Sequence, residues 1–398
     1  MRICIVYDCL YPHTVGGAER WYRELAQRLA EDGHEVTYVT MRQWQRGERA
    51  QIDPRVRVVT AAPRMALYTR EGRRRILPPL VFGLGVLAHL LRARRSYEVV
   101  HTCSFPYFPL LAAAAVRPLG RYGLVVDWFE VWSRSYWRDY LGGLQGWIGA
   151  LVQRLCVRVP QRAFCFSELH LRRLEEEGLV GPRAVLRGLS VGSQAHSAIA
   201  AEQLVVFAGR LIPEKRTLLG VAAVALATPR VPGLRAVFYG DGPEREALQR
   251  AIVEHGLSET VQAPGFAESE LLEQDMRRAL CVLLPSRREG YGLVVVEASA
   301  HATPAVVVAG EDNAAVELVE DGVNGVIAVD DAPETVAQAI VRVHELGMAL
   351  RESTAQWYAQ HAQELSLESS LAAVLASYRG GGAQPQGTGA LGKPNARA

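Results

Sequence analysis

The chain has 398 residues, of which 49% are hydrophobic and 22% are charged. These values are ordinary for a soluble globular protein rather than a disordered chain, and the length allows two domains with separate cores. The net charge of +2 conceals an imbalance, because residues 1–200 contain 28 Lys and Arg against 17 Asp and Glu, whereas residues 201–398 contain 16 against 25. We therefore expect an anionic acceptor or surface to favour the first half.

The cysteines and apolar runs exclude other classes of protein. The six cysteines show no Cys-x-x-Cys pair and no metal-ligand spacing, so we expect buried thiols in a reducing cytoplasm. Residues 1–20 lack the order of a signal peptide. The best candidate for a membrane span, residues 76–91, is only 16 residues long and contains two prolines and two glycines, so we expect no span.

The beginning of the chain indicates a β-α-β unit. Residues 2–8 are typical of a buried strand, a helical pattern continues to Gly33, and residues 34–40 form the next strand. Gly16 and Gly17 lie at the first strand-to-helix turn. A glycine pair at this place either makes the turn or lets the backbone approach a phosphate or a sugar.

Residues 64–95 combine an apolar run with positive charge. Eight arginines and one glutamate surround the apolar residues 76–91. One interpretation is a surface helix that packs its apolar side on the domain. The other is a basic amphipathic segment on anionic lipid, which would make the protein peripheral at the inner membrane face.

Two further strands are predicted to end in polar or aromatic residues. Residues 98–103 form a strand with His101 near its end, and this histidine lies in a ligand cleft or is structural. The strand that begins at residue 124 leads into aromatic and charged residues as far as Tyr140. Aromatic rings there fill the core or, because so short a loop is not expected to bury all of them, meet a sugar or lipid-linked acceptor. We predict an acceptor wall made by Asp127, Trp128, Glu130, Trp132 and Trp137.

A change of pattern divides the chain. Residues 162–167 are predicted to be the last strand of the first half, and residues 187–203 form a linker with glycines and small polar side chains. Alternation of strands and helices restarts at residue 204. We predict one Rossmann-like domain over 1–190, a second over 200–350, helices over 351–379 and a disordered tail over 380–398.

The first loop of the second half carries two cations. A strand over residues 204–209 is followed by Arg210 and Lys215, in the segment Gly-Arg-Leu-Ile-Pro-Glu-Lys. The chain has only two lysines among 44 basic residues, so a lysine here indicates a need for a compact ammonium group. The pair either forms a solvated basic loop or holds a diphosphate whose negative charge grows as a bond breaks.

The segment 285–297 indicates most about the chemistry. An apolar strand ends at Leu284, and a polar loop with two glycines leads into small and apolar residues. Three consecutive valines favour a strand on propensity, but the loop predicts a helix start. Glu289 then lies at a strand end, where open α/β sheets bind ligands, and Glu297 lies inside the helix. The free N–H groups of Gly292, Leu293 and Val294 are predicted to face an anion.

The alternative interpretation of this segment is that Glu289 is a solvated loop charge and Glu297 an ordinary helix residue. The seven-residue spacing between the two glutamates, the Gly-x-Gly between them and the upstream Gly-Arg-x-x-x-Glu-Lys segment together resemble the signature of retaining glycosyltransferases of family 4. The resemblance covers residues 1–379. It implies the GT-B architecture, an α/β fold with two Rossmann-like domains that face a central cleft and a last helix that crosses back to the first domain.

The resemblance also implies an activity. A hexose would move from a nucleotide diphospho-sugar, the co-substrate, to an envelope glycan or a lipid-linked acceptor. No Asp-x-Asp occurs in the chain, so a metal held by that motif is not expected, and neither a further cofactor nor a nucleic-acid partner is expected. Two rivals stay open. They are a nucleotide-sugar epimerase of the same architecture and a non-catalytic scaffold that binds nucleotide-sugars.

Individual roles follow from the same resemblance. Glu289 would hold sugar hydroxyls and stabilise charge on the ring, with Gly290 and Tyr291 beside it, and Glu297 would bind the ribose. His101 is the second candidate catalytic residue, in the sugar and acceptor cleft. The diphosphate would be bound by Arg210, Lys215, Gly16, Gly17, Gly292, Leu293 and Val294, and the base by Gly265 and Phe266.

Overall fold

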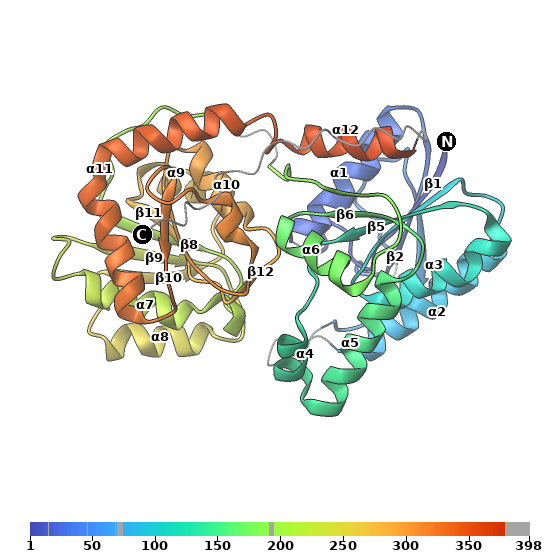
Figure 1. The fold of residues 1–398 in the computed structure, drawn as a ribbon, viewed down its shortest axis with the longest axis horizontal. Coiled ribbons are helices and arrows are strands. Elements are labelled where there is room, and N and C mark those ends of the chain that lie inside the picture. Colours follow the sequence, from blue (N-terminus) through green and yellow to red (C-terminus); the bar gives the residue numbers. More distant parts are fainter. Residues whose placement is uncertain (15, 46, 68, 70–74, 191–194, 379–398) are drawn as a thin grey trace. The chain divides into compact units, whose positions relative to one another are not determined.

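The computed structural model describes residues 1–14, 16–45, 47–67, 69, 75–190 and 195–378. This part of the chain forms two compact units. Unit 1 contains the described residues up to Leu189 together with residues 368–378, and unit 2 contains the described residues from Ser190 to Leu367. Each unit is built on a parallel sheet with helices (Figure 1), which confirms the predicted α/β class with two Rossmann-like folds.

The sheet of unit 1 has seven strands in the order β3-β2-β1-β4-β5-β6-β7, and all neighbours are parallel. Nearly all residues of β1, β4 and β5 are buried, as is typical of parallel strands with helices on both faces of the sheet. The strands are β1 (Arg2–Val6), β2 (Glu35–Met41), β3 (Arg57–Ala62), β4 (Val99–Cys103), β5 (Gly123–Trp128), β6 (Arg162–Cys165) and β7 (Arg183–Val185).

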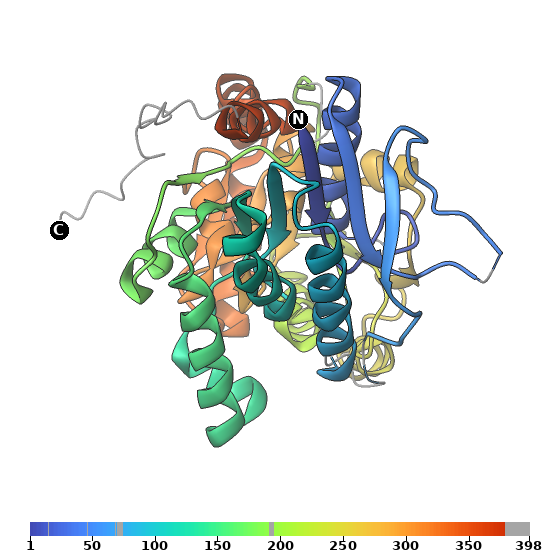
Figure 2. The same ribbon diagram turned by 90° about the vertical axis from the view of Figure 1, so that its right-hand side faces the viewer.

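The helices of unit 1 include the last one of the described chain. They are α1 (Gly17–Glu31), α2 (Leu77–Arg92), α3 (Tyr107–Gly120), α4 (Arg134–Leu141), α5 (Gly143–Val157), α6 (Glu168–Glu177) and α12 (Leu367–Tyr378). Side chains of α2, α3 and α5 share one core with the sheet, and both ribbon views show α2 and α3 side by side (Figures 1 and 2). An ion pair of 2.5 Å between Arg28 and Glu368 joins α12 to α1.

The sheet of unit 2 has six parallel strands in the order β10-β9-β8-β11-β13-β15, and a separate pair is formed by β12 and β14. The strands are β8 (Leu204–Ala208), β9 (Arg235–Tyr239), β10 (Val261–Gly265), β11 (Cys281–Leu284), β12 (Arg288–Glu289), β13 (Ala305–Val308), β14 (Asp312–Asn313) and β15 (Gly325–Ala328). The helices are α7 (Thr217–Ala227), α8 (Arg245–Glu254), α9 (Ser269–Arg278), α10 (Leu293–Ala300) and α11 (Pro333–His361), with short 3₁₀ turns at Pro213–Lys215 and Ala314–Leu318.

Several elements were not predicted from the sequence. They are the edge strands β3, β7 and β15, the short pair β12 and β14, and the helices α3, α4, α5 and α8. Within residues 64–95 the structure has one helix, α2, while residues 68 and 70–74 and the predicted tail over 380–398 lie outside the described residues. In the described ranges no helix combines the length and the apolar character needed to cross a bilayer.

Candidate functional site

The strand order of unit 2 changes direction between β8 and β11. Strands β9 and β10 follow β8 on one side of it in the sheet, and β11, β13 and β15 then lie on its other side. The loops that follow β8 and β11 therefore leave the sheet in opposite directions at the carboxyl ends of neighbouring strands. Such a switch point is where open α/β sheets bind ligands.

The two loops at this switch point are joined to each other. The backbone N–H of Arg287 donates to the carbonyl of Glu214 over 2.8 Å, and the ammonium group of Lys215 forms an ion pair with the carboxylate of Glu289. The side chains of Lys215 and Glu289 are 16% and 15% exposed. Two residues that are 74 positions apart thus meet as a partly buried charge pair.

The carboxylate of Glu289 is positioned by its surroundings. Ser286 Oγ donates to Glu289 Oε2 over 3.1 Å, and in the β12–β14 pair Glu289 lies opposite Asn313. The amide group of Asn313 donates to the carbonyls of Ser286, at 3.1 Å, and of Val308, at 2.8 Å. Ser286 and Asn313 were missed as site residues, although both follow predicted strands in the sequence.

The start of α10 requires a glycine. Gly292 precedes the helix with φ of 102°, in the left-handed region, and a Cβ at this position would lie 2.6 Å from the Cβ of Ala315. No side chain caps the helix, so the first N–H groups, including those of Leu293 and Val294, have no capping acceptor. Uncapped N–H groups at a helix start favour an anion, and an anion contact at Gly292, Leu293 and Val294 stays a prediction.

The other predicted donor residues of unit 2 lie on the same loops or next to them. Arg210 is exposed in the loop after β8, Tyr291 is buried after Glu289, and Glu297 is half-buried on α10. Gly265 ends β10 with φ of 103°, and the ring of Phe266 is 78% exposed. The convergence of Arg210 with Lys215 and Glu289 stays a prediction.

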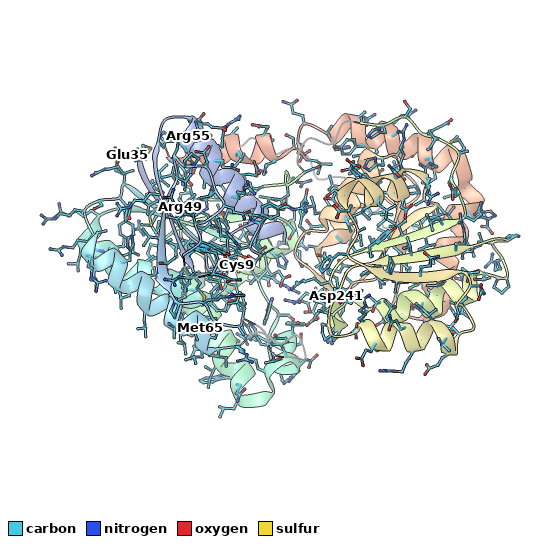
Figure 3. The ribbon with its side chains drawn as sticks, turned by 180° about the vertical axis from the view of Figure 1, so that it is seen from behind. Cys9, Glu35, Arg49, Arg55, Met65 and Asp241 are labelled. Atoms are coloured by element: carbon cyan, nitrogen blue, oxygen red, sulfur yellow. The ribbon has the colours of Figure 1, made fainter. Side chains whose placement is uncertain are left out.

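The loop after β9 completes this edge of the sheet. The N–H of Leu211 donates to the carbonyl of Asp241 over 2.9 Å, and the N–H of Gly240 donates to the carbonyl of Gly265 over 2.8 Å. Gly240 has φ of 132°, and a Cβ there would lie 1.8 Å from the carbonyl oxygen of Gly209. In Figure 3, Asp241 marks this loop in unit 2 and Cys9 marks the loop after β1 in unit 1.

In unit 1, His101 is enclosed. Its Nε2 lies 2.8 Å from Asp127 Oδ1, at a distance typical of an ion pair but without hydrogen-bond angles. Its Nδ1 lies 2.5 Å from the hydroxyl of Tyr378 on α12, and Trp21 Nε1 donates to Asp127 Oδ2 over 2.7 Å. Burial raises the pKa of Tyr378 well above its usual value, so its hydroxyl stays neutral.

The enclosure of His101 bears on its predicted role. The histidine and Asp127 are both 0% exposed, so neither reaches a substrate in this arrangement. Of the two interpretations left open by the sequence, the structure supports the structural strand-end histidine. Gly16 precedes α1 in an extended conformation and Gly17 has open space around its Cα, so a diphosphate contact at these glycines stays a prediction.

The predicted acceptor wall requires a correction. Trp128 is 0% and Trp137 is 4% exposed, and the carboxylate of Asp127 is buried with them, so these three residues do not form a wall, although the loop leaves Trp132 and Tyr140 half-buried, as expected of so short a segment. The rings are buried because they pack against α5, a helix that was not predicted from the sequence. Gln153 on α5 accepts hydrogen bonds from Trp137 Nε1, at 3.1 Å, and from the backbone of Trp132, at 3.0 Å.

What remains of the wall is small. Trp132 and Glu130 are half-buried, and Trp132 Nε1 donates to Glu130 Oε2 over 2.7 Å. Any contact between these two side chains and an acceptor stays a prediction. Over the described residues, no three His, Cys, Asp or Glu side chains cluster in a way that fits a metal ion.

Two protein-family profiles match the chain. The profile described as Glycosyltransferase Family 4 matches residues 15–185, and the profile described as Glycosyl transferases group 1 matches residues 193–361. Fold and profiles together define a glycosyltransferase of the GT-B type. The chain belongs to glycosyltransferase family 4.

Individual proteins resemble the chain at lower identity. D-inositol 3-phosphate glycosyltransferase of Jonesia denitrificans is 32% identical over 182 residues, which span 44% of this chain and 42% of that protein. This chain spans less than half the length of the first curated relatives that it matches, between 21% and 42%.

Two solved structures share the fold. Sucrose-phosphate synthase from Thermosynechococcus elongatus has a TM-score of 0.75 and 17% identity, with 95% of this chain and 98% of that one covered. HepE of Anabaena, in complex with UDP and glucose, has a TM-score of 0.70 and 19% identity, with 95% and 99% covered.

The contacts of Asn313 generate a first prediction. Asn313→Ala leaves two buried carbonyls without a donor, so the free energy of unfolding should fall by about 2–3 kcal/mol in a urea titration. Because the loop of Glu289 is then no longer held, amide exchange at Arg287 and Glu289 should accelerate.

The matched control is Asn324→Ala, since Asn324 is also buried and its amide also bonds backbone groups, a carbonyl at 2.9 Å and an N–H at 2.7 Å, in a different loop; Asn313 likewise accepts from the N–H of Ala315, at 3.1 Å. It should cost similar stability and leave exchange at Arg287 unchanged. Equal exchange in the two variants would show that Asn313 does not position the site.

Proposed function

We propose that the protein transfers a hexose, with retention of the anomeric configuration, from a nucleotide diphospho-sugar to an envelope glycan or a lipid-linked acceptor. The observation that carries the proposal is the charge pair of Lys215 and Glu289 at the switch point of unit 2. Membership of family 4 supports the transfer of a sugar. A GT-B structure in complex with UDP and glucose supports a nucleotide-sugar donor.

The diphosphate end of the donor needs positive charge. Lys215 and Arg210 supply two cations, and the uncapped start of α10 supplies free N–H groups. These groups offset the negative charge that develops on the leaving diphosphate. We propose that they do so without a metal ion and without a further cofactor, because they provide the charge compensation that a divalent cation gives in other sites.

The charge pair implies an exchange when the donor arrives. In the free protein Lys215 is bound to the carboxylate of Glu289. A diphosphate would compete for the same ammonium group, since both partners are anions. Its arrival would release Glu289 to accept hydrogen bonds from sugar hydroxyls, while Ser286 keeps the carboxylate in place.

The bond changes balance without a separate base. The bond between the anomeric carbon and the diphosphate oxygen breaks, and the leaving diphosphate takes the electron pair. The acceptor hydroxyl forms the new bond on the same face of the sugar, and its proton passes to the leaving diphosphate oxygen. Glu289, as a fixed carboxylate, stabilises the positive charge on the ring between these events.

The remaining donor contacts complete the proposal. Glu297, about 7 Å along α10 from its start, would accept from the ribose hydroxyls. The exposed ring of Phe266, with Gly265 before it, would stack on the base. Gly290 and Tyr291 would line the sugar beside Glu289.

The acceptor side belongs to unit 1. Its net positive charge and the arginines of residues 64–95 favour an anionic membrane surface. We propose that the protein works in the cytoplasm, peripheral to the inner membrane face, where a lipid-linked or envelope acceptor is presented.

Lys215→Ala should weaken binding of the nucleoside diphosphate by about 10- to 100-fold, because a charge-assisted contact is lost. A thermal-shift screen over UDP, GDP and ADP selects the nucleotide, and isothermal titration calorimetry gives the affinity. The control is Arg230→Ala, which removes an exposed cation of the same unit that pairs with Glu345. Unchanged affinity in Lys215→Ala would remove the diphosphate assignment.

Glu289→Gln should lower the rate of transfer on the order of 100-fold while the nucleoside diphosphate still binds, because the charge on the sugar ring loses its partner. The wild-type product, followed by proton NMR at the anomeric carbon, should keep the configuration of the donor.

An inverted product would contradict retention. An altered free donor sugar formed without an acceptor would favour the epimerase, and full cellular function of the variant would favour the scaffold.

A further inference from the structure

Helix α5 presents its large apolar side chains to solvent. The exposed residues recur at three- and four-residue intervals, so they lie on one face of the helix. They are Leu144 at 74%, Trp147 at 63%, Ile148 at 46%, Leu151 at 42% and Leu155 at 52% exposed. We call these five residues the α5 stripe. At 3.6 residues per turn they fall within an arc of about 100° and extend over about 16 Å.

The opposite face of α5 carries small and polar residues. A Cβ at Gly146 would lie 2.4 Å from the carbonyl oxygen of Trp137, and a Cβ at Gly149 would lie 2.4 Å from the ring of Trp137. Gln153 is buried on the same face and bonds Trp132 and Trp137. Glycine and glutamine therefore face inward, whereas leucine, isoleucine and tryptophan face outward. A surface helix of a water-soluble protein normally has the opposite arrangement, with its large apolar side chains toward the core.

The segment that contains the stripe is basic. Residues 131–158 contain four arginines and one acidic residue, Asp139. Arg134 and Arg138 lie on α4, and Arg154 and Arg158 lie at the end of α5. Figures 1 and 2 both show α4 and the adjoining end of α5 extending beyond the sheet of unit 1.

We propose that the α5 stripe inserts into the interface of an anionic lipid bilayer, with the helix lying parallel to the surface. An apolar stripe that includes tryptophan and is flanked by arginines is the composition that such interfacial helices require. A second copy of the chain fits less well, because a two-fold contact would bring together eight arginines, four from each copy, with Asp139 of each copy as the one acidic residue of the same segment. This inference deepens the proposed membrane association, and it depends on no particular sugar or nucleotide.

The test compares matched variants of the full chain on vesicles of equal parts phosphatidylglycerol and phosphatidylcholine. The double variant Trp147→Ser, Leu151→Ser should bind the vesicles on the order of tenfold more weakly than the wild type, because two apolar side chains no longer enter the lipid. Leu226→Ser with Val253→Ser is the matched control, since both residues are exposed apolar residues of unit 2, at 45% and 67%. The control should bind as the wild type does.

Tryptophan fluorescence reports the insertion directly. All seven tryptophans lie within the described residues, and Trp147 is 63% exposed whereas the other six are buried or half-buried. Emission should shift to the blue on vesicle binding and be quenched by brominated lipid. Trp147→Phe should bind equally well and lose most of the quenching.

Three results would overturn the inference. Binding that disappears at high salt, without a blue shift, would leave only an electrostatic association. A loss in Leu77→Ser with Leu84→Ser but not in the α5 variant would move the contact to α2. Absence of binding with concentration-dependent self-association in sedimentation equilibrium would assign the stripe to a second copy. In each case an unchanged rate of sugar transfer would leave the proposed reaction standing.

Discussion

The ion pair of Lys215 with Glu289 depends on the order of strands in the second sheet. Because β8 and β11 are neighbours and the chain leaves them in opposite directions, the loops at their carboxyl ends are brought together. The backbone bond from Arg287 to Glu214 joins the same two loops. A cation and a carboxylate are therefore brought to one place, a few residues before the start of α10, and we propose that a sugar diphosphate binds there.

The sequence predicted the parts of this site that local signals specify. Buried parallel strands are continuous apolar runs, and the glycines after them mark tight turns, so β8, β11 and the start of α10 were predicted close to their observed bounds. Three valines in α10 favour a strand on propensity, and packing of Val295 and Val296 in the core overrides it. Asn313 was missed because its role depends on carbonyls that only the folded loop brings near.

In unit 1, the burial of the aromatic rings and of His101 could not be predicted from local sequence signals. An aromatic run in a loop is expected to be partly exposed, but whether its rings are buried depends on a partner that the run itself does not contain. Here α5 is that partner, with glycines that let Trp137 approach and Gln153 to bond it. The same helix thereby turns its own leucines outward. Likewise His101 is enclosed by Tyr378, which is 277 residues away in the chain.

The central claim is that a diphosphate and the carboxylate of Glu289 compete for Lys215. A double-mutant cycle on nucleoside diphosphate affinity, with Lys215→Ala, Glu289→Gln and the double variant, tests it most directly. If they compete, Glu289→Gln should strengthen binding of the nucleoside diphosphate when Lys215 is present and have little effect in the Lys215→Ala background. The difference between the two effects, which is the coupling free energy of the two residues, should be about 1 kcal/mol or more. Strictly additive effects would contradict the account, because Lys215 would then act independently of its observed partner.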